Sequence, residues 1–471
     1  MAKSSIKSNF LFNAAYQILS MFVPLVTTPY VSRVLGVEGI GLFSYTFAIA
    51  QYFLLFVMLG LNNYGNRAIA RVRDDKETLS RTFSEIYSMQ ILGGSLVILV
   101  YGLYVAFFAE QPLLSLTMGL LVLSGLFDIN WFFFGVEEFK LIVVRNFFIK
   151  VISLVLIFTF VKGPHALLFY SFVTVFGILL SQIALFPFLK KYISISLPKI
   201  KDIIPHIKPN LTLFLTVIAV SIYTIINKII LGFVTTPAEV GLYESAMKII
   251  AIPTMIVTAL GTVMLPRMSN LIANDNGEHE ALLSKSFIFA IFISSAMAFG
   301  IMGISKLFVP LFYGPGFEKC ADLYLILLPA CIAFALGNVV RTQVLIPRGM
   351  DRIYVTSGFM GAAVNVCINL VLIPIWGSIG AAIGTLFTET TVAAYQLMMG
   401  RRYIHLMKYA KVIAAIIISG ISMFCALYFV EFTLVSTLAT LIVKIFLGMV
   451  VYGICLGGLV VAMRVKIKEL R

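Results

Sequence analysis

Apolar stretches of about 20 residues follow one another along almost the whole chain, and short polar connections separate them. A helix needs about 20 mainly apolar residues to cross the hydrocarbon core of a bilayer, because it rises about 1.5 Å per residue. The pattern therefore predicts an all-α polytopic membrane protein with about fourteen transmembrane helices. The expected helices cover residues 10–32, 39–60, 84–108, 113–135, 143–161, 166–189, 211–233, 241–265, 286–312, 321–346, 355–374, 378–399, 411–430 and 434–463.

Composition supports this interpretation. Of the 471 residues, 60% are hydrophobic and 12% are charged, whereas a soluble globular protein carries about 25% charged residues. The mean hydropathy is +1.02, and the polar connections leave no room for a separate soluble domain. The formal net charge of +14 could suggest nucleic acid, but the basic residues sit in short loops and form no long basic face. We therefore expect no nucleic-acid partner.

The distribution of Lys and Arg predicts the orientation in the membrane. If the N-terminus is cytoplasmic, the outer loops hold only Arg33, Lys162 and Lys319, and the inner loops and tails hold most of the remaining basic residues. Such a bias toward one side orients membrane proteins with the basic loops in the cytoplasm. We expect both termini to be cytoplasmic.

A proline-containing polar connection divides the chain into two similar halves. The motif Arg33-Val-Leu-Gly36 at the end of the first helix resembles Lys228-Ile-Ile-Leu-Gly232 in the seventh, and each precedes a related glycine-containing motif. Because each copy holds six helices, the two lobes should be related by a pseudo-two-fold axis along the membrane normal. We expect an N-terminal six-helix lobe at residues 1–189 and a cytoplasmic linker at residues 190–210. A C-terminal six-helix lobe should follow at residues 211–400, and two extra helices with a cytoplasmic tail at residues 401–471.

Charged residues inside a span are expensive, so they are the first candidates for function. Arg33 and Lys228 occupy equivalent repeat positions, and Lys248 lies deeper in the eighth helix, which predicts a cationic substrate-binding cavity. The alternative is that Arg33 and Lys228 snorkel to the interface and that Glu244, one turn away, neutralises Lys248. Lys150 lies near an expected inner helix end, where snorkelling accounts for it.

A second group of polar residues is a candidate for ion coupling. Its uncharged members are Asn227, Asn365, Asn369 and Thr385. Their oxygens could bind sodium, because hard cations select oxygen ligands, or they could simply hydrogen-bond neighbouring helices. Glu389 and Asp128 are separate candidates for proton coupling, although either could belong to a buried pair. Lys444, in the middle of the last span, has no assigned role.

The sequence offers little support for an enzyme. It contains no nucleophile elbow, phosphate loop or paired-carboxylate motif, and no outer loop is long enough to fold into a catalytic element. The five cysteines and four histidines lack the spacing of a zinc site. We expect no catalytic residues, no cofactor and no metal other than sodium.

Several motifs carry a resemblance to a known family. The opening motifs are Pro24-Leu-Val-Thr-Thr-Pro-Tyr30, Ser32-Arg-Val-Leu-Gly36 and Gly39-Ile-Gly-Leu-Phe43, and the later ones are Asp128-Ile-Asn-Trp-Phe-Phe-Phe-Gly135, Glu138-Phe-Lys140, Arg145-Asn146 and Gly377-Ser-Ile-Gly-Ala-Ala-Ile-Gly384. Together they resemble Wzx-type polysaccharide transporters of the multidrug, oligosaccharidyl-lipid and polysaccharide exporter superfamily. The resemblance spans about residues 10 to 400.

This resemblance implies a flippase of the bacterial inner membrane that works by alternating access between two helical bundles. Its cargo would be an undecaprenyl-diphosphate-linked oligosaccharide for capsule or O-antigen export, and some relatives couple transport to sodium at a site similar to Asn365, Asn369 and Thr385. A polysaccharide polymerase and glycosyltransferases are the expected partners of a monomer. The alternatives are a lipid II flippase and a multidrug or cation antiporter, whereas a membrane glycosyltransferase or polymerase is disfavoured because it would usually need a large outer loop.

Overall fold

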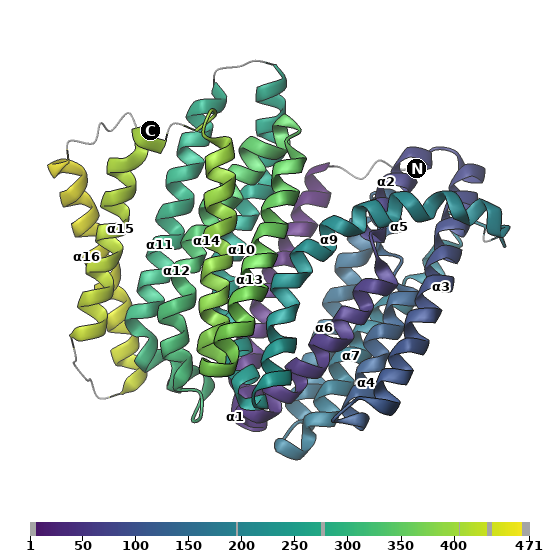
Figure 1. Cartoon of the computed structure of the whole chain (residues 1–471), viewed down its shortest axis with the longest axis horizontal. Helices are drawn as coiled ribbons and strands as arrows, with labels where there is room; N and C mark the ends of the chain where they lie inside the picture. Colours follow the sequence, from purple (N-terminus) through teal and green to yellow (C-terminus); the bar gives the residue numbers. More distant parts are fainter. Residues whose placement is uncertain (1–5, 195, 275–277, 405, 431–435, 464–471) are drawn as a thin grey trace. The chain divides into compact units, whose positions relative to one another are not determined.

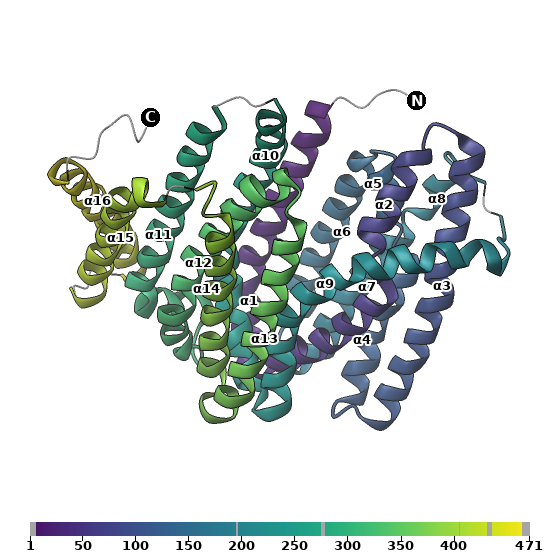
Figure 2. The same cartoon turned by 45° about the horizontal axis from the view of Figure 1, so that its top comes forward.

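A computed structural model describes residues 6–194, 196–274, 278–404, 406–430 and 436–463, and these residues form helices and connections without a strand. Eleven of the described helices are long and apolar enough to cross a membrane. The predicted all-α polytopic fold is confirmed, whereas both chain ends, predicted to be cytoplasmic, lie outside the described residues. The chain divides into two compact units, Met1–Ile229 and Ile230–Arg471, which are described separately (Figures 1 and 2).

The first unit contains α1 to α8 and most of α9. The bounds are α1 Ile6–Met58, α2 Leu61–Val72, α3 Lys76–Phe107, α4 Pro112–Ser124, α5 Asn130–Gly135, α6 Phe139–Phe160, α7 Leu167–Ile183, α8 Phe186–Leu189 and α9 Ile200–Val234. Within this unit α1 packs against α3, α4 and α6, and α7 packs against α4 and α6. Each expected span of the N-terminal half contains a helix, although the fourth is interrupted.

The first two expected spans form one helix with a kink. Gly36 lies at the kink with φ of 71° and ψ of 177°, a backbone conformation that residues with a Cβ rarely adopt. Glycine therefore lets the chain bend without an interhelical loop, and α1 contains both residues 10–32 and most of residues 39–60.

A buried glutamine explains why the fourth expected span is broken. α4 ends at Ser124, and the chain continues through a 3-10 turn before α5 starts at Asn130. Gln90 on α3 donates its side-chain amide to the carbonyl oxygens of Gly125, at 2.6 Å, and Asp128, at 3.0 Å. It also accepts a hydrogen bond from the Trp131 indole at 3.1 Å. Gln90 thus satisfies carbonyl groups that the break releases inside an apolar environment.

The aromatic run after this break forms a core. Trp131 and Phe132 are fully buried, and the Trp131 ring lies 5.5 Å from that of Phe83 between centroids. A Cβ added to Gly65 on α2 would lie 2.6 Å from the Trp131 ring, so the absence of a side chain permits this close packing. The segment Asp128–Gly135, one of the motifs that carry the family resemblance, therefore stabilises the packing of α2, α3 and α5.

The linker expected at residues 190–210 is partly helical. α9 begins at Ile200, and Pro205 and Pro209 lie inside it. Ile203 is buried in the aromatic core just described, and this packing holds the helix although each proline removes a backbone donor. The first half of α9 crosses the ends of α2 and α3 (Figure 1).

The second unit contains the remaining helices, and all its expected spans are helical in the residues described. The bounds are α10 Pro237–Ala273, α11 Glu278–Tyr313, α12 Lys319–Val340, α13 Asp351–Trp376, α14 Ser378–Gly400, α15 Leu406–Phe429 and α16 Thr437–Ala462. α12 packs against α10, α11 and α14, and α13 pairs with α14. A short π-helix, Arg341–Leu345, continues α12.

Two charged residues, Glu239 and Lys444, tie helices of this unit together through hydrogen bonds. Glu239 at the start of α10 accepts from the Lys319 ammonium group at 2.7 and 2.8 Å and from the Ser378 backbone N–H at 2.7 Å, which joins α10, α12 and α14. The buried Lys444 of α16 donates to the Leu427 carbonyl of α15 at 2.9 Å. α15 and α16, the two helices expected outside the repeat, pack on α11 (Figure 1).

Candidate functional site

The three predicted substrate-binding cations lie on different helices. Arg33 on α1 is exposed and donates to the Pro29 carbonyl at 2.9 Å, which anchors its guanidinium beside its own helix. Lys228 on α9 and Lys248 on α10 are half-buried. Arg33 and Lys228 belong to the first unit and Lys248 to the second, so their contact with a common substrate stays a prediction.

Asn365 and Asn369 of α13 form a buried row, the amide row, with Thr388 of α14. Asn369 donates to the Asn365 side-chain oxygen at 3.0 Å, and Asn365 donates to the Thr388 hydroxyl at 3.0 Å. The half-buried Thr385 meets the Tyr243 hydroxyl of α10 at 2.8 Å. The structure thus brings Asn365 and Asn369 together as their four-residue spacing predicts, and it adds two hydroxyl groups that the sequence analysis did not include.

The remaining ion-coupling candidates are dispersed. Glu389 is half-buried on α14, and Asn227 is buried on α9 of the first unit. Asp128 lies at the break between α4 and α5 and accepts from Asn130 through the backbone N–H at 3.0 Å and the side-chain amide at 2.8 Å. Asp128 therefore belongs to a local network, whose other members line a cavity.

This cavity of about 440 Å³ lies inside the first unit, between α1, α6 and α7, with Asn130 in its wall. Its lining combines the cations Arg145 and Lys150 with amide and hydroxyl side chains, and apolar side chains of the helices form the rest of the wall. Lys150 lies near the middle of α6 because the helix begins at Phe139, earlier than the sequence suggested. Its assignment as a snorkelling residue at a helix end is therefore wrong.

Neutral amides position the Arg145 guanidinium at the cavity wall. Its Nη2 donates to the Asn130 side-chain oxygen at 3.2 Å and to the Asn146 side-chain oxygen at 2.8 Å, and its Nε donates to Asn146 at 3.1 Å. Asn130 is held in turn by Asp128 and by the Gln182 side-chain oxygen, at 3.1 Å. These amides are neutral and orient the guanidinium, whose charge also interacts with the Asp128 carboxylate.

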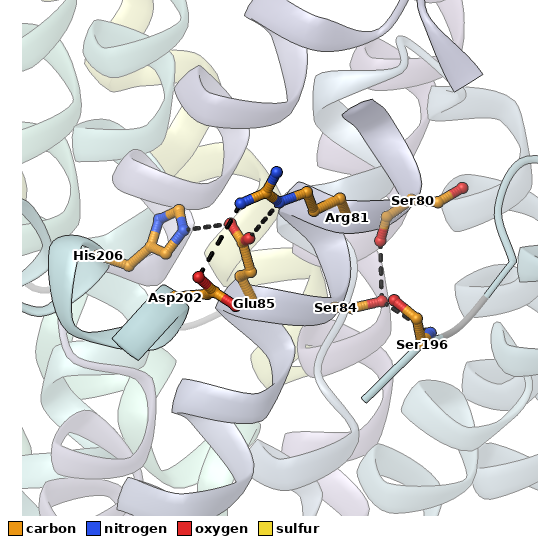
Figure 3. A network of polar contacts seen from close by, with 7 residues as sticks. All are labelled: Ser80, Arg81, Ser84, Glu85, Ser196, Asp202 and His206. Carbon is orange, nitrogen blue, oxygen red and sulfur yellow. Dashed lines mark hydrogen bonds and ion pairs between the residues drawn. The ribbon is translucent and has the colours of Figure 1, made fainter. Parts of the chain in front are cut away.

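A second polar cluster, the linker network, joins α9 to α2 and α3, and Figure 3 shows its contacts between α9 and α3. Glu85 of α3 accepts from Arg81 Nε at 2.8 Å and contacts His206 Nε2 at 2.9 Å. The other ring nitrogen of His206 lies 2.6 Å from the Tyr64 hydroxyl of α2, and Arg81 lies 4.0 Å from Asp202 of α9. The Glu85 and His206 side chains are 11% and 14% exposed, so their contact is largely shielded from water, whereas the Arg81 side chain is 70% exposed.

The chain before α9 is fixed to the same face of α3. The backbone N–H of Ser194 donates to the Ser80 hydroxyl at 3.1 Å, and that of Ser196 donates to the Ser84 hydroxyl at 3.2 Å. Ser84 in turn donates to the Ser80 carbonyl at 2.8 Å, as Figure 3 shows. The described part of the expected linker is thus attached to the first unit at several points.

Sequence analysis missed the cavity and the linker network. His206 stood out only as one of four histidines, and its partner Glu85 is 121 positions away in the chain. A usable signal was the presence of Gln90 and Gln182 in otherwise apolar helices, since buried amides need hydrogen-bond partners there.

Comparisons with known proteins agree with this architecture. Residues 6–272, more than half of the chain, match the family described as "Polysaccharide biosynthesis protein". A Shigella dysenteriae protein assigned as an O-antigen transporter is 25% identical over 397 residues, which cover 83% of this chain and 99% of that relative. An Escherichia coli (strain K12) protein with the same assignment is 24% identical over 407 residues, which cover 85% of this chain and 97% of that relative. The solved structure of the lipid II flippase MurJ, in an inward closed conformation, aligns over 96% of this chain and 99% of its own with a TM-score of 0.71 and 17% identity, which shows a common fold.

Proposed function

Because the chain belongs to the polysaccharide biosynthesis protein family, we propose that it flips an undecaprenyl-diphosphate-linked oligosaccharide from the cytoplasmic to the outer leaflet of the membrane. The protein is a multi-pass protein of the bacterial inner membrane and, like its curated relatives, a transporter and not an enzyme. The observation that carries the proposal is the match to O-antigen transporters along nearly their whole length. The product would be capsule or O-antigen, and the polymerase and glycosyltransferases of the same pathway would be its partners.

The chemistry of this cargo requires positive charge along its path. A diphosphate that enters hydrocarbon loses its hydration, and cationic side chains restore favourable contacts. We assign this role to Arg33, Lys228 and Lys248, and their exposed or half-buried state supports the assignment because none of them is enclosed in the protein core. The sugars would follow a hydrated path while the lipid tail stays in the bilayer.

Coupling to an ion is the second element of the proposal. Sodium would bind near Asn365, Asn369 and Thr385, and the hydrogen bond between Asn365 and Asn369 supports a shared position for their side chains. The alternative is proton coupling through Glu389 or Asp128. Translocation that depends on a sodium gradient would favour the amide row, and translocation that depends on a proton gradient alone would favour the carboxylates.

The proposal is tested in proteoliposomes that contain a lipid-linked oligosaccharide with a fluorescent headgroup. Purified wild-type protein should expose the headgroup to an impermeant quencher faster than protein-free liposomes do. Arg33→Gln and Lys228→Gln should slow this exposure, whereas Lys228→Arg should be milder because charge is retained. The exposed Lys76→Gln at the start of α3 is the matched control and should have no effect.

Two results would refute parts of the proposal. Translocation of lipid II but not of the lipid-linked oligosaccharide would reject the cargo. Full activity of both Arg33→Gln and Lys228→Gln would remove the cationic mechanism. Because Glu244 lies one helical turn from Lys248, Lys248→Gln must be compared with the Glu244→Gln, Lys248→Gln double variant. Full activity of that double variant would show that the two residues act as scaffold.

A further inference from the structure

The cavity in the first unit has the size and the chemistry of a binding site. Its volume of about 440 Å³ falls in the range of about 300–1,000 Å³ that is usual for small-ligand sites. Basic residues within apolar spans are costly and usually serve a substrate path or a partner. Arg145 and Lys150 both line the cavity, and they lie about 7.5 Å apart along α6 by helical rise.

The two cations favour an anionic ligand. Arg145 is held by the side-chain oxygens of Asn130 and Asn146, which fix its direction at the wall. A guanidinium positioned in this way can form paired hydrogen bonds with phosphate oxygens, and an ammonium group adds a second point charge. The Asp128 carboxylate accepts a hydrogen bond from Asn130 and so fixes the side-chain amide that holds Arg145.

The walls that α1 and α7 contribute to the cavity favour a polyhydroxylated ligand. Thr27 on α1 and Thr174 on α7 each donate their hydroxyl hydrogen to a carbonyl of their own helix, at 3.0 and 2.8 Å, and Ser181 does so at 2.7 Å. A hydroxyl oxygen has two acceptor lone pairs, so these groups remain able to accept hydrogen bonds from sugar hydroxyls. All three residues line the cavity.

We propose that this cavity binds a phosphate-bearing saccharide, with Arg145 and Lys150 on the phosphate and the hydroxyl-rich walls on the sugar. The inference rests on the proposed function and adds to it a substrate subsite within the N-terminal unit, built from residues other than Arg33, Lys228 and Lys248. A diphosphate linked to the first sugar of the lipid-linked oligosaccharide has this chemistry. The glycerol phosphate headgroup of a bilayer phospholipid shares it, so the test separates the two sources.

The experiment measures binding of tritiated farnesyl diphosphoryl N-acetylglucosamine to the full chain in phosphatidylcholine nanodiscs. Arg145→Gln and Lys150→Gln should each weaken binding about tenfold or more, because each removes a charge-assisted contact. Thr27→Phe should weaken it similarly by filling the cavity while both charges remain. Lys140→Gln on the exposed first turn of α6 is the matched control and should bind like the wild type. Inorganic pyrophosphate should compete, and a farnesyl glycoside without the diphosphate should not.

The outcomes separate this subsite from the general function. If the wild type binds and translocates but all three cavity variants bind equally well, the subsite is refuted and the flippase function stands. If the wild type neither binds the probe nor translocates the oligosaccharide, the proposed function itself fails. If phosphatidylglycerol in the nanodiscs displaces the probe from the wild type, a bilayer headgroup is the occupant and the saccharide assignment is overturned.

Discussion

Replacing His206 with Ala should release the first turns of α9 from the rest of the N-terminal unit. The imidazole lies between the Glu85 carboxylate, at 2.9 Å, and the Tyr64 hydroxyl, at 2.6 Å. Because Glu85 is only 11% exposed, water replaces the lost donor poorly. A hydrogen bond to a charged group contributes about 1.5–3 kcal/mol. Local opening of residues 200–210 should therefore become about 10- to 150-fold more frequent.

Hydrogen–deuterium exchange of the protein in nanodiscs measures this opening directly. Amides of residues 200–210 should exchange faster in His206→Ala, and those in the middle of α4 should not change. Glu85→Ala should have a similar effect, and the double variant should add little to either because both substitutions break the same contact between Glu85 and His206. Lys201→Gln, an exposed position on the same helix, is the control. Unchanged exchange in His206→Ala would refute the stabilising role of the linker network.

Three further predictions concern other parts of the molecule. Gly377→Ala should lower the free energy of unfolding by about 1–3 kcal/mol, because Gly377 has a φ of 57° and an added Cβ would lie 2.6 Å from a Glu239 carboxylate oxygen; an unchanged thermal unfolding midpoint would contradict this. Asn369→Ala should abolish the sodium dependence of headgroup translocation, and equal sodium dependence in wild type and variant would make the amide row structural. In a cysteine-free background, single cysteines near Lys162 should react with an impermeant thiol reagent in intact cells and those near Lys199 should not; the reverse pattern would overturn the predicted topology.

The extent of the helices could be predicted from the sequence because hydropathy reports which stretches lipid can surround. Their interruptions could not, because they depend on backbone geometry and on distant partners. Gly36 joins two expected spans through a positive φ, and the break after Ser124 is stabilised by Gln90 from another helix. The helical start of α9 was missed because prolines and lysines hid the apolar spacing of Ile200, Ile203, Ile204 and Ile207, which is typical of an amphipathic helix.

The candidate sites, like the helices, could be predicted from the sequence only in part. The spacing of Asn365 and Asn369 placed both on one face of a helix, and their side chains are hydrogen-bonded. Sequence spacing alone could not choose between Thr385 and Thr388 as the neighbour of Asn365, because both lie on the next helix and are three residues apart. Lys150 was misjudged because the helix start was set four residues late, which placed a mid-helix cation near the membrane surface.

The contact between Lys444 and the Leu427 carbonyl has a consequence for biogenesis. A lysine at the centre of a helix raises the cost of membrane insertion by about 2.5–3.5 kcal/mol, and Lys444, about two turns after the start of α16, incurs part of that cost. α16 incurs this cost when it inserts alone, but Lys444 gains a hydrogen-bond acceptor once α15 lies beside α16. We therefore expect the translocation machinery to insert the two helices together as a hairpin. α15 would stay at the lateral exit until α16 has been synthesised. A chain that lacks α15 should retain α16 in the aqueous channel longer than its high apolar content alone would suggest.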